Sequence, residues 1–216
     1  MVLDAVIFDL DGVIINSEQL ADKANVEFLE SFGVTYDRNK IKPLLTGKTL
    51  LENTQVLMEY YQLKGDPIML TKERIKSRQK LYENKLQFIP GFENFFQEIR
   101  MKSLKTAIAT ASPLELLEIA NLQFSLSQLF DGQIYCVDVI GCPSKPAPDI
   151  FLYAAGALAV DPQCCLVIED SPAGIESAIA AKMKVIGITT TYGNEKLAAA
   201  TKIVDSFSEI DLTLYI

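Results

Sequence analysis

The sequence predicts an α/β protein with a doubly wound, mostly parallel sheet and an inserted helical segment. Short apolar runs bounded by turn residues recur along the chain, and most are apolar on both faces, as the strands of a covered parallel sheet are. Helical patterns alternate with these runs in the second half of the chain. After the first run, by contrast, a long stretch has helical patterns and no strand signal.

The strands and helices of the sheet region follow from this alternation. The predicted strands are Ala5–Leu10, Thr106–Thr110, Gln133–Val137, Cys165–Ile168 and Val185–Ile188, with Ile203–Val204 as a shorter sixth candidate. The predicted helices are Pro113–Leu122, Pro148–Ala157 and Pro172–Lys182. Each of these helices has proline near its first turn, where the missing N–H costs no helical hydrogen bond.

The stretch between the first two strands contains three further helical patterns, Glu18–Phe32, Thr49–Tyr61 and Thr71–Leu86. An insertion of about 70 residues is too long for a loop of a compact domain. We therefore predict a core domain formed by residues 1–16 and 87–216 and a helical cap domain formed by residues 17–86. The expected hinges are Ile14–Ser17 and Gln87–Gly91.

The composition of the chain excludes or disfavours several classes of partner and of catalysis. The chain has 216 residues, 49% of them hydrophobic, and a net charge of −8, which disfavours nucleic acid and anionic membranes as partners. It contains no histidine, which excludes histidine-based catalysis and histidine-ligated zinc from this chain. The four cysteines form no CxxC pair, and neither a signal peptide nor a membrane span is recognisable. These features predict a cytoplasmic protein with reduced thiols.

Carboxylates follow two of the predicted strands. Asp9 and Asp11 come at the end of the first strand, and Glu169 and Asp170 follow Cys165–Ile168. Ligands of open α/β sheets bind at the carboxyl ends of strands, and hard oxygen ligands suit Mg²⁺. A solvated turn or a calcium loop is the alternative for the first pair. Helix capping ahead of Pro172 is the alternative for the second.

Two other strand ends carry groups that suit a phosphate. The hydroxyl of Thr110 and the free N–H groups around Ala111 can cradle phosphate oxygens, although Ser112 can also act as a helix cap before Pro113. Lys145 lies in a loop that enters a helix, where its ammonium can neutralise phosphate charge, the alternative being a solvated surface lysine. Together the four segments place carboxylates, a hydroxyl and an ammonium around one crevice.

In these four segments the chain resembles the haloacid dehalogenase-like superfamily. The matching motifs are Asp9-Leu10-Asp11-Gly12-Val13, Ile108–Ser112, Lys145 in Ser-Lys-Pro-Ala-Pro-Asp, and Leu166–Gly174. They occur in the family's order and at suitable spacing, and the resemblance, with its Rossmann-like core, covers essentially the whole chain. The resemblance is to the branch with a helical cap after the first strand, which includes phosphoglycolate phosphatase-type and β-phosphoglucomutase-type proteins. It implies a phosphatase that acts on a small phosphorylated metabolite, as a monomer or weak homodimer.

The resemblance also implies roles for the residues. Asp9 would be the nucleophile that becomes an aspartyl-phosphate, and Asp11 would be the general acid and base. Thr110, Ala111 and Lys145 would bind the phosphoryl group. Asp9, the Asp11 carbonyl and Asp170 would bind Mg²⁺, with support from Glu169. In the cap, Gly47 and Lys48 occupy the position of a substrate-facing loop, and Lys76 and Arg78 on a later helix are further candidate contacts for a second anionic group; exposed surface charges are the alternative for each lysine and arginine.

Two departures from the family pattern bear on function. Asn16-Ser17 stands where many relatives with a cap carry Asp-Ser or Asp-Thr. β-Phosphoglucomutase places a cap histidine near its substrate, and this chain has none. A phosphomutase is therefore the alternative to a phosphatase, and a haloacid dehalogenase fits less well because it needs neither Mg²⁺ nor Asp11. An alternative of another class is a non-catalytic phospho-acceptor or binding module.

Overall fold

The computed structural model describes residues 2–215, apart from the side chain of Asn84. Its centre is a six-stranded sheet in the order β3-β2-β1-β4-β5-β6, and every neighbouring pair is parallel. The strands are β1 (Ala5–Phe8), β2 (Lys105–Thr110), β3 (Ile134–Cys136), β4 (Cys165–Glu169), β5 (Lys184–Ile188) and β6 (Lys202–Val204). This sheet confirms the predicted fold class, and the predicted strands differ from it only at their ends.

Helices cover both faces of the sheet because alternate side chains of each buried strand point in opposite directions. Val6 and Phe8 belong to a buried apolar cluster that includes side chains of α5 (Phe92–Met101), α6 (Leu114–Phe124) and α7 (Leu126–Leu129). Ala5 and Ile7 face the other cluster, which contains α8 (Val137–Ile140), α9 (Asp149–Ala157) and α10 (Pro172–Ala180). Burial on both faces explains why the strands read as continuous apolar runs.

Aromatic packing fixes the end of β1. The ring of Phe8 is edge-on to the rings of Phe92 and Phe130, with centroid distances of 5.8 and 5.9 Å. All three side chains are fully buried. Burial of a phenylalanine side chain is worth about 1.5–3 kcal/mol, so this cluster holds the strand end firmly. The backbone N–H of Asp9, the next residue, donates to the Ile168 carbonyl of β4 at 3.0 Å.

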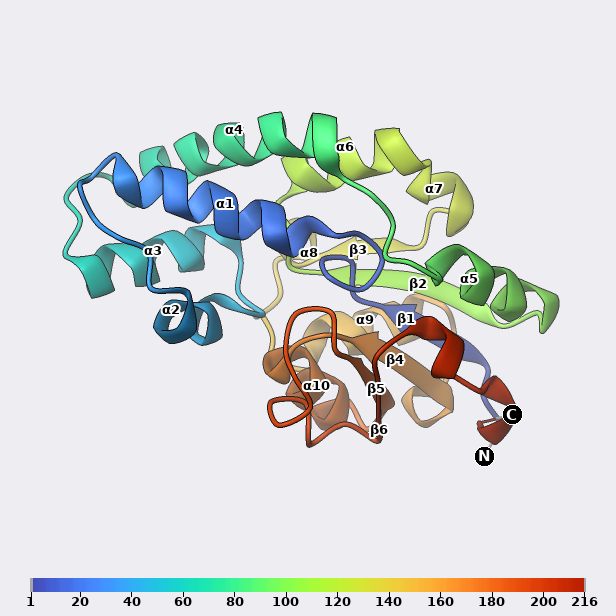
Figure 1. Cartoon of the computed structure of the whole chain (residues 1–216). Coiled ribbons are helices and arrows are strands. Elements are labelled where there is room, and N and C mark those ends of the chain that lie inside the picture. Colours follow the sequence, from blue (N-terminus) through green and yellow to red (C-terminus); the bar gives the residue numbers. More distant parts are fainter. Residues whose placement is uncertain (1, 216) are drawn as a thin grey trace.

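Four consecutive helices follow β1: α1 (Ser17–Glu30), α2 (Arg38–Leu45), α3 (Leu50–Tyr61) and α4 (Pro67–Lys85). They have their own apolar cluster, which includes Leu29 and Leu57, and they are grouped at one side of the molecule, away from both chain ends (Figure 1). The sequence predicted α1, α3 and α4. It did not predict α2, which contains Pro43 in its interior, or α5 on the sheet.

The two segments that connect the four helices to the sheet lie side by side. The Asn16 N–H donates to the Gln87 carbonyl at 3.0 Å, and the Gln87 N–H donates to the Asn16 side-chain oxygen at 2.8 Å. The Ile89 N–H donates to the Ile14 carbonyl at 2.9 Å. Asn16 therefore supplies a donor and an acceptor to the hydrogen bonds that join these two segments.

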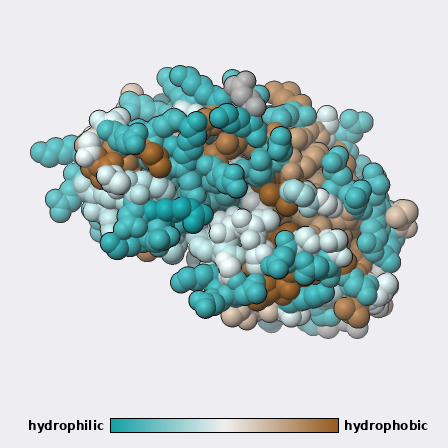
Figure 2. Space-filling view, viewed as in Figure 1, coloured by the Kyte–Doolittle hydropathy of each residue, from teal (hydrophilic) through white to brown (hydrophobic). Residues whose placement is uncertain are grey.

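The molecular surface has hydrophilic and hydrophobic regions, and the cysteines are free thiols. Hydrophilic residues cover most of the visible face over α1–α4, and hydrophobic residues gather over the part that contains the sheet (Figure 2). Within residues 2–215, the helices are too short or too polar to cross a membrane. All four cysteines are free; Cys136 and Cys165 are buried, and Cys142 and Cys164 are half-buried.

Candidate active site

A cavity of about 90 Å³ lies between the carboxyl ends of the strands and the helices α1–α4. Strand order reverses at β1 and β4, which is where ligands of doubly wound sheets bind. The sequence-predicted site residues that line the cavity are Asp9, Asp11, Thr110, Ala111, Lys145, Glu169 and Asp170 from the sheet region, with Gly47, Lys48 and Arg78 from the helices. The fold thus brings together nearly all of the predicted site.

Lys145 lies at the centre of this site. Its ammonium donates to Asp9 Oδ1 at 2.6 Å, to Glu169 Oε1 at 2.7 Å and to the Ala109 carbonyl at 3.2 Å, so all three hydrogens are used. Its exposed fraction is 2%, so it is not a solvated surface lysine. Burial lowers the pKa of Lys145, but the Asp9 and Glu169 carboxylates outweigh burial and raise it, so the group stays charged.

The carboxylates that line the cavity outnumber the Lys145 ammonium. Burial raises the pKa of Asp9 to about 8, helped by Glu169 and Asp11 and opposed by Lys145. Burial also raises the pKa of Asp170 well above its ordinary value, with the Glu169 carboxylate adding to the effect. Like charges crowded in a dry site resist ionisation unless a further cation is present. The site therefore has an excess of negative charge that a divalent cation would balance.

Asp170 also has an atom suited to such a cation. Its Oδ2 is buried and has no hydrogen-bond partner among the described residues. A Cβ added to Gly12 would lie 1.9 Å from this oxygen, so the Asp11-Gly12 backbone approaches Asp170 as only glycine permits. No cluster of three or more Asp, Glu, His or Cys side chains within residues 2–215 is arranged to hold a metal. Mg²⁺ commonly takes one or two carboxylates and keeps several waters, so Asp9 and Asp170 fit it.

Glu169 accepts hydrogen bonds from Lys145 and from the turn after β4. Its Oε1 accepts from Lys145, and its Oε2 accepts from the N–H groups of Asp170 and Ser171 and from the Ser171 hydroxyl, each at 2.9 Å. Both carboxylate oxygens are therefore occupied by donors. Glu169 therefore orients Lys145 and the turn after β4, and its support of a metal stays a prediction. Ser171 also caps α10, as the capping alternative predicted, by accepting from the Gly174 N–H at 3.1 Å.

Asp11 is held by hydroxyl groups from the helices. Asp11 Oδ1 accepts from the Ser17 hydroxyl of α1 at 2.5 Å and from the Tyr82 hydroxyl of α4 at 3.3 Å. Burial raises the pKa of Asp11, and the Ser17 hydrogen bond opposes this. A carboxyl group with a raised pKa at a cavity suits proton transfer. Sequence reasoning missed Tyr82, because nothing in an apolar helix pattern marks a tyrosine that reaches back to Asp11.

The turn after β2 provides the other predicted phosphate contacts. Thr110 is buried, and its side-chain oxygen accepts from the Ser112 N–H at 2.9 Å, which shapes the turn around Ala111. The N-cap of α6 is Pro113, and Ser112 makes no side-chain cap bond there. Ser112 instead lies near Asp11, whose pKa its hydroxyl lowers. The capping alternative for Ser112 is therefore wrong.

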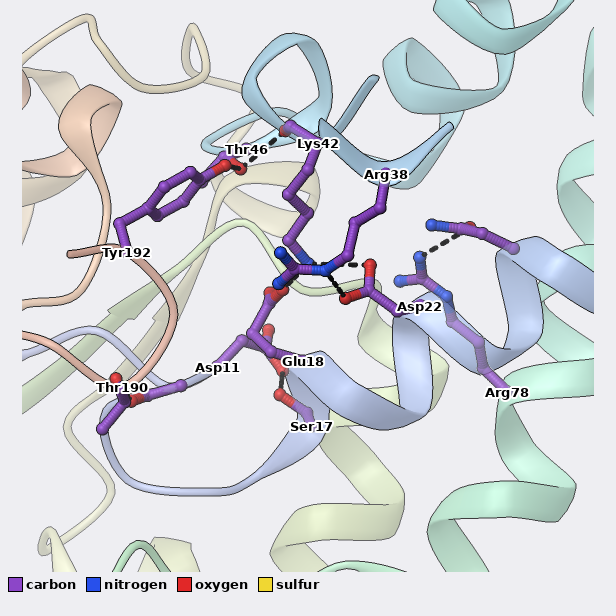
Figure 3. Close-up of polar contacts among 12 residues, drawn as sticks. Asp11, Ser17, Glu18, Asp22, Arg38, Lys42, Thr46, Arg78, Thr190 and Tyr192 are labelled. Carbon is purple, nitrogen blue, oxygen red and sulfur yellow. Dashed lines mark hydrogen bonds and ion pairs between the residues drawn. The ribbon is translucent and has the colours of Figure 1, made fainter. Parts of the chain in front are cut away.

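The helices supply the opposite wall of the cavity. Gly47 has φ +83°, and a Cβ there would lie 2.6 Å from the Ala173 Cβ, so this loop closely approaches α10. Lys48 is half-buried at the cavity. A second group that sequence reasoning missed is the buried Lys42, which pairs with Glu18 and, at 3.2 Å, with Asp22 (Figure 3).

The two predicted contacts on α4 differ. Arg78 is buried and lines the cavity. Lys76 is exposed on the same helix and is not one of the residues that line the cavity. Two positions on a helix are separated by about 200° around its axis, so both side chains cannot face one cavity. We therefore retain Arg78, and not Lys76, as a candidate substrate contact.

The known proteins similar to this chain include two phosphatases and a β-phosphoglucomutase. A probable pseudouridine-5'-phosphatase of Drosophila melanogaster is 30% identical over 208 residues, which are 94% of this chain and 89% of that protein. Hexitol phosphatase B of Escherichia coli O157:H7 is 31% identical and covers 92% of this chain and 93% of its own length. The crystal structure of β-phosphoglucomutase from Clostridium difficile matches with a TM-score of 0.82 and 26% identity, covering 98% of this chain and 95% of that one.

A family model agrees with these relatives. The model of the haloacid dehalogenase-like hydrolases matches residues 3–182, a range that contains all four sequence motifs. Both the matched range and the near-complete coverage of the relatives include the helices α1–α4 as well as the sheet. The chain therefore belongs to the haloacid dehalogenase-like hydrolases.

Proposed function

We propose that this chain is a Mg²⁺-dependent phosphatase that hydrolyses a small phosphorylated metabolite, a sugar phosphate or a phosphoglycolate-like acid, through an aspartyl-phosphate. The observation that carries the proposal is the position of Lys145, whose ammonium binds Asp9 and Glu169 in a buried cavity that Asp170 also lines. Two of the relatives described above are phosphatases, which supports the same reaction.

The reaction uses two carboxyl groups in turn. An Asp9 oxygen attacks the phosphorus atom while the bond to the ester oxygen breaks, and Asp11 gives that oxygen its proton. Asp11, now ionised, takes a proton from water as the water oxygen attacks the phosphorus of the aspartyl-phosphate. This releases phosphate and restores both side chains. A covalent intermediate divides one difficult hydrolysis into two easier steps.

Charge at the phosphoryl group is balanced by its surroundings. Lys145, the Thr110 hydroxyl and the Ala111 N–H would hold the transferred oxygens, where fixed cations and dipoles are most effective. Asp9, the Asp11 carbonyl and Asp170 would hold Mg²⁺, which supplies further positive charge when bound. Ser17 and Tyr82 keep the Asp11 carboxyl group oriented toward the cavity.

The helical segment 17–86 acts in this proposal as a cap on the core formed by residues 1–16 and 87–216. Movement about Ile14–Ser17 and Gln87–Gly91 admits the substrate, and closure excludes bulk water. The net charge of −8 favours a small-molecule substrate over nucleic acid or an anionic membrane. We further propose that the enzyme works in the cytoplasm, as a monomer or weak homodimer.

The test is hydrolysis of a generic aryl phosphate by the wild type and by Asp9→Asn, with and without Mg²⁺. We expect Mg²⁺-dependent release of phosphate by the wild type and none by Asp9→Asn, with the circular dichroism spectrum unchanged. Asp4→Asn is the matched control, because Asp4 is an exposed aspartate at the other end of the same strand. Activity retained in Asp9→Asn would overturn the assignment of the nucleophile.

A further inference from the structure

Two buried polar atoms in the helical wall of the cavity have no hydrogen-bond partner among the described residues. They are Nε of Arg78, on α4, and Oδ1 of Asn53, on α3. Each residue is 9% exposed, and both line the cavity. Buried polar groups are nearly always paired, so two such atoms beside one cavity indicate a bound group that pairs with them.

The two atoms have opposite hydrogen-bonding character. The Nε of Arg78 can only donate, and the side-chain oxygen of Asn53 can only accept. Arg78 is anchored from one side by a single long bond, from Nη2 to Asn25 Oδ1 at 3.5 Å. Arg74 donates to the same oxygen at 2.8 Å and to Thr54 Oγ1 at 2.7 Å, and so fills the polar space behind Arg78. The Arg78 side chain is therefore held through Nη2, while its Nε has no acceptor among the described residues.

Of the other two cations of the helical wall, Lys48 is only half-buried, and the buried one, Lys42, is already paired. Lys42 is bound by Glu18 and Asp22, and Asp22 also accepts from Arg38 at 2.6 Å (Figure 3). A second anionic group of a substrate would therefore gain little from Lys42. Arg78 remains the buried donor that faces the cavity, and Asn53 adds an acceptor to the same wall.

The donor on Arg78 and the acceptor on Asn53 indicate which kind of chemical group would pair with them. A carboxylate or phosphate carries only acceptors when ionised, so it would satisfy Arg78 but would present a second acceptor to Asn53. An alkyl group would leave both atoms without a hydrogen bond. A hydroxyl group accepts from Arg78 Nε through its oxygen and donates its hydrogen to Asn53 Oδ1, and neighbouring hydroxyls can divide these roles.

We propose that Arg78 and Asn53 form a hydroxyl-binding subsite that selects polyhydroxylated phosphate monoesters, of the sugar or alditol class, over esters whose second polar group is an anion. The proposal rests on the phosphatase function proposed above and narrows its two substrate classes to one. It also replaces the expectation that the positive side chains of α4 bind a second anionic group. Loss of one such hydrogen bond lowers kcat/KM about tenfold.

The first experiment needs no variant. Phosphate release by the wild type with Mg²⁺ is measured for glucitol 6-phosphate, for phosphoglycolate and for an aryl phosphate. We expect kcat/KM to be at least about tenfold higher for the alditol phosphate than for phosphoglycolate. Equal values, or a preference for phosphoglycolate, would overturn the subsite while leaving phosphatase function intact. No release from any of the three esters would instead overturn the phosphatase function, and the subsite with it.

The second experiment removes the acceptor with Asn53→Leu. The ratio of kcat/KM for the alditol phosphate to that for the aryl phosphate is expected to fall about tenfold, mainly through KM. Gln55→Leu is the matched control, because Gln55 is an exposed amide two positions along the same helix, and it should leave this ratio unchanged. An unchanged ratio in Asn53→Leu, with the wild-type melting temperature retained, would rule out Asn53 as a specificity residue.

Discussion

The position of Lys145 depends on its two carboxylate partners, and Glu169 is the one that also accepts hydrogen bonds from the turn after β4. The Glu169 side chain is 1% exposed and is held between the Lys145 ammonium and the turn that begins α10. A buried charge is tolerated only when it is paired and hydrogen-bonded, so each partner requires the other. Packing around this carboxylate therefore controls the position of the lysine that neutralises the phosphoryl group.

Gly174 leaves the space in which Glu169 lies. A Cβ added at Gly174 would be 1.7 Å from Glu169 Oε1, so Gly174→Ala must displace this carboxylate. We expect a loss of about 1–3 kcal/mol in the free energy of unfolding, measured with urea, and at least a tenfold fall in kcat. Gly156→Ala is the control, because nothing lies within 4 Å of a Cβ at this helical glycine. A Gly174→Ala enzyme with wild-type stability and activity would contradict this role of Glu169.

At the scale of elements, two further polar contacts, besides those of Asp11 with Ser17 and Tyr82, join the helices α1–α4 to the sheet region. The Thr46 and Tyr192 hydroxyls form a hydrogen bond between the α2 end and the loop after β5. The Ser144 hydroxyl, from the loop that carries Lys145, donates to Glu52 of α3 at 2.6 Å. Thr46 lines the cavity, and in the proposed mechanism both contacts would favour closure of the cap over the site.

Removal of one contact tests the contribution of closure. Tyr192→Phe deletes the hydroxyl that reaches Thr46 and is expected to lower kcat/KM about fivefold, because one neutral hydrogen bond contributes about 1 kcal/mol. Steady-state kinetics with an aryl phosphate measure the effect. Tyr153→Phe, at an exposed tyrosine on α9, is the matched control. Identical kcat/KM values for both variants would show that this bond does not stabilise the catalytic arrangement.

The elements that could be predicted from sequence are those whose own pattern specifies them. The six strands are apolar on both faces, and Lys145 lies between breakers in a recognisable motif. Helix α2 is only eight residues long and contains Pro43, so its pattern resembles a loop. Contacts such as Tyr82 with Asp11, which lie 71 positions apart, depend on how the helices pack, and the sequence pattern does not encode that distance.

At the scale of the whole molecule, the excess negative charge of the site links stability to pH and Mg²⁺. The pKa of Asp9 is raised from 3.8 to about 8 by folding. In the metal-free protein its contribution to stability is complete below about pH 4 and is lost as pH rises toward about 8. A divalent cation between Asp9 and Asp170 would relieve this loss where the carboxylates are ionised.

Mg²⁺ is therefore expected to raise the melting temperature more at pH 8 than at pH 5. Calorimetric scans with excess Mg²⁺ or EDTA measure this difference. Asp170→Asn should remove most of the Mg²⁺ effect at pH 8, because it deletes the charge of the carboxylate whose Oδ2 accepts no hydrogen bond from the described part of the chain. A Mg²⁺ effect of the same size at both pH values, or one that persists in Asp170→Asn, would contradict this location of the cation.

The most direct test of the account is the covalent state of Asp9 during turnover. The Asp11→Asn variant is mixed with an aryl phosphate, whose leaving group needs no proton, quenched in acid and digested for peptide mass spectrometry. Because this variant lacks the base that activates water, we predict that the phosphoryl group accumulates on the peptide that contains Asp9. Turnover without phosphate on Asp9, or phosphate on another residue, would contradict the mechanism.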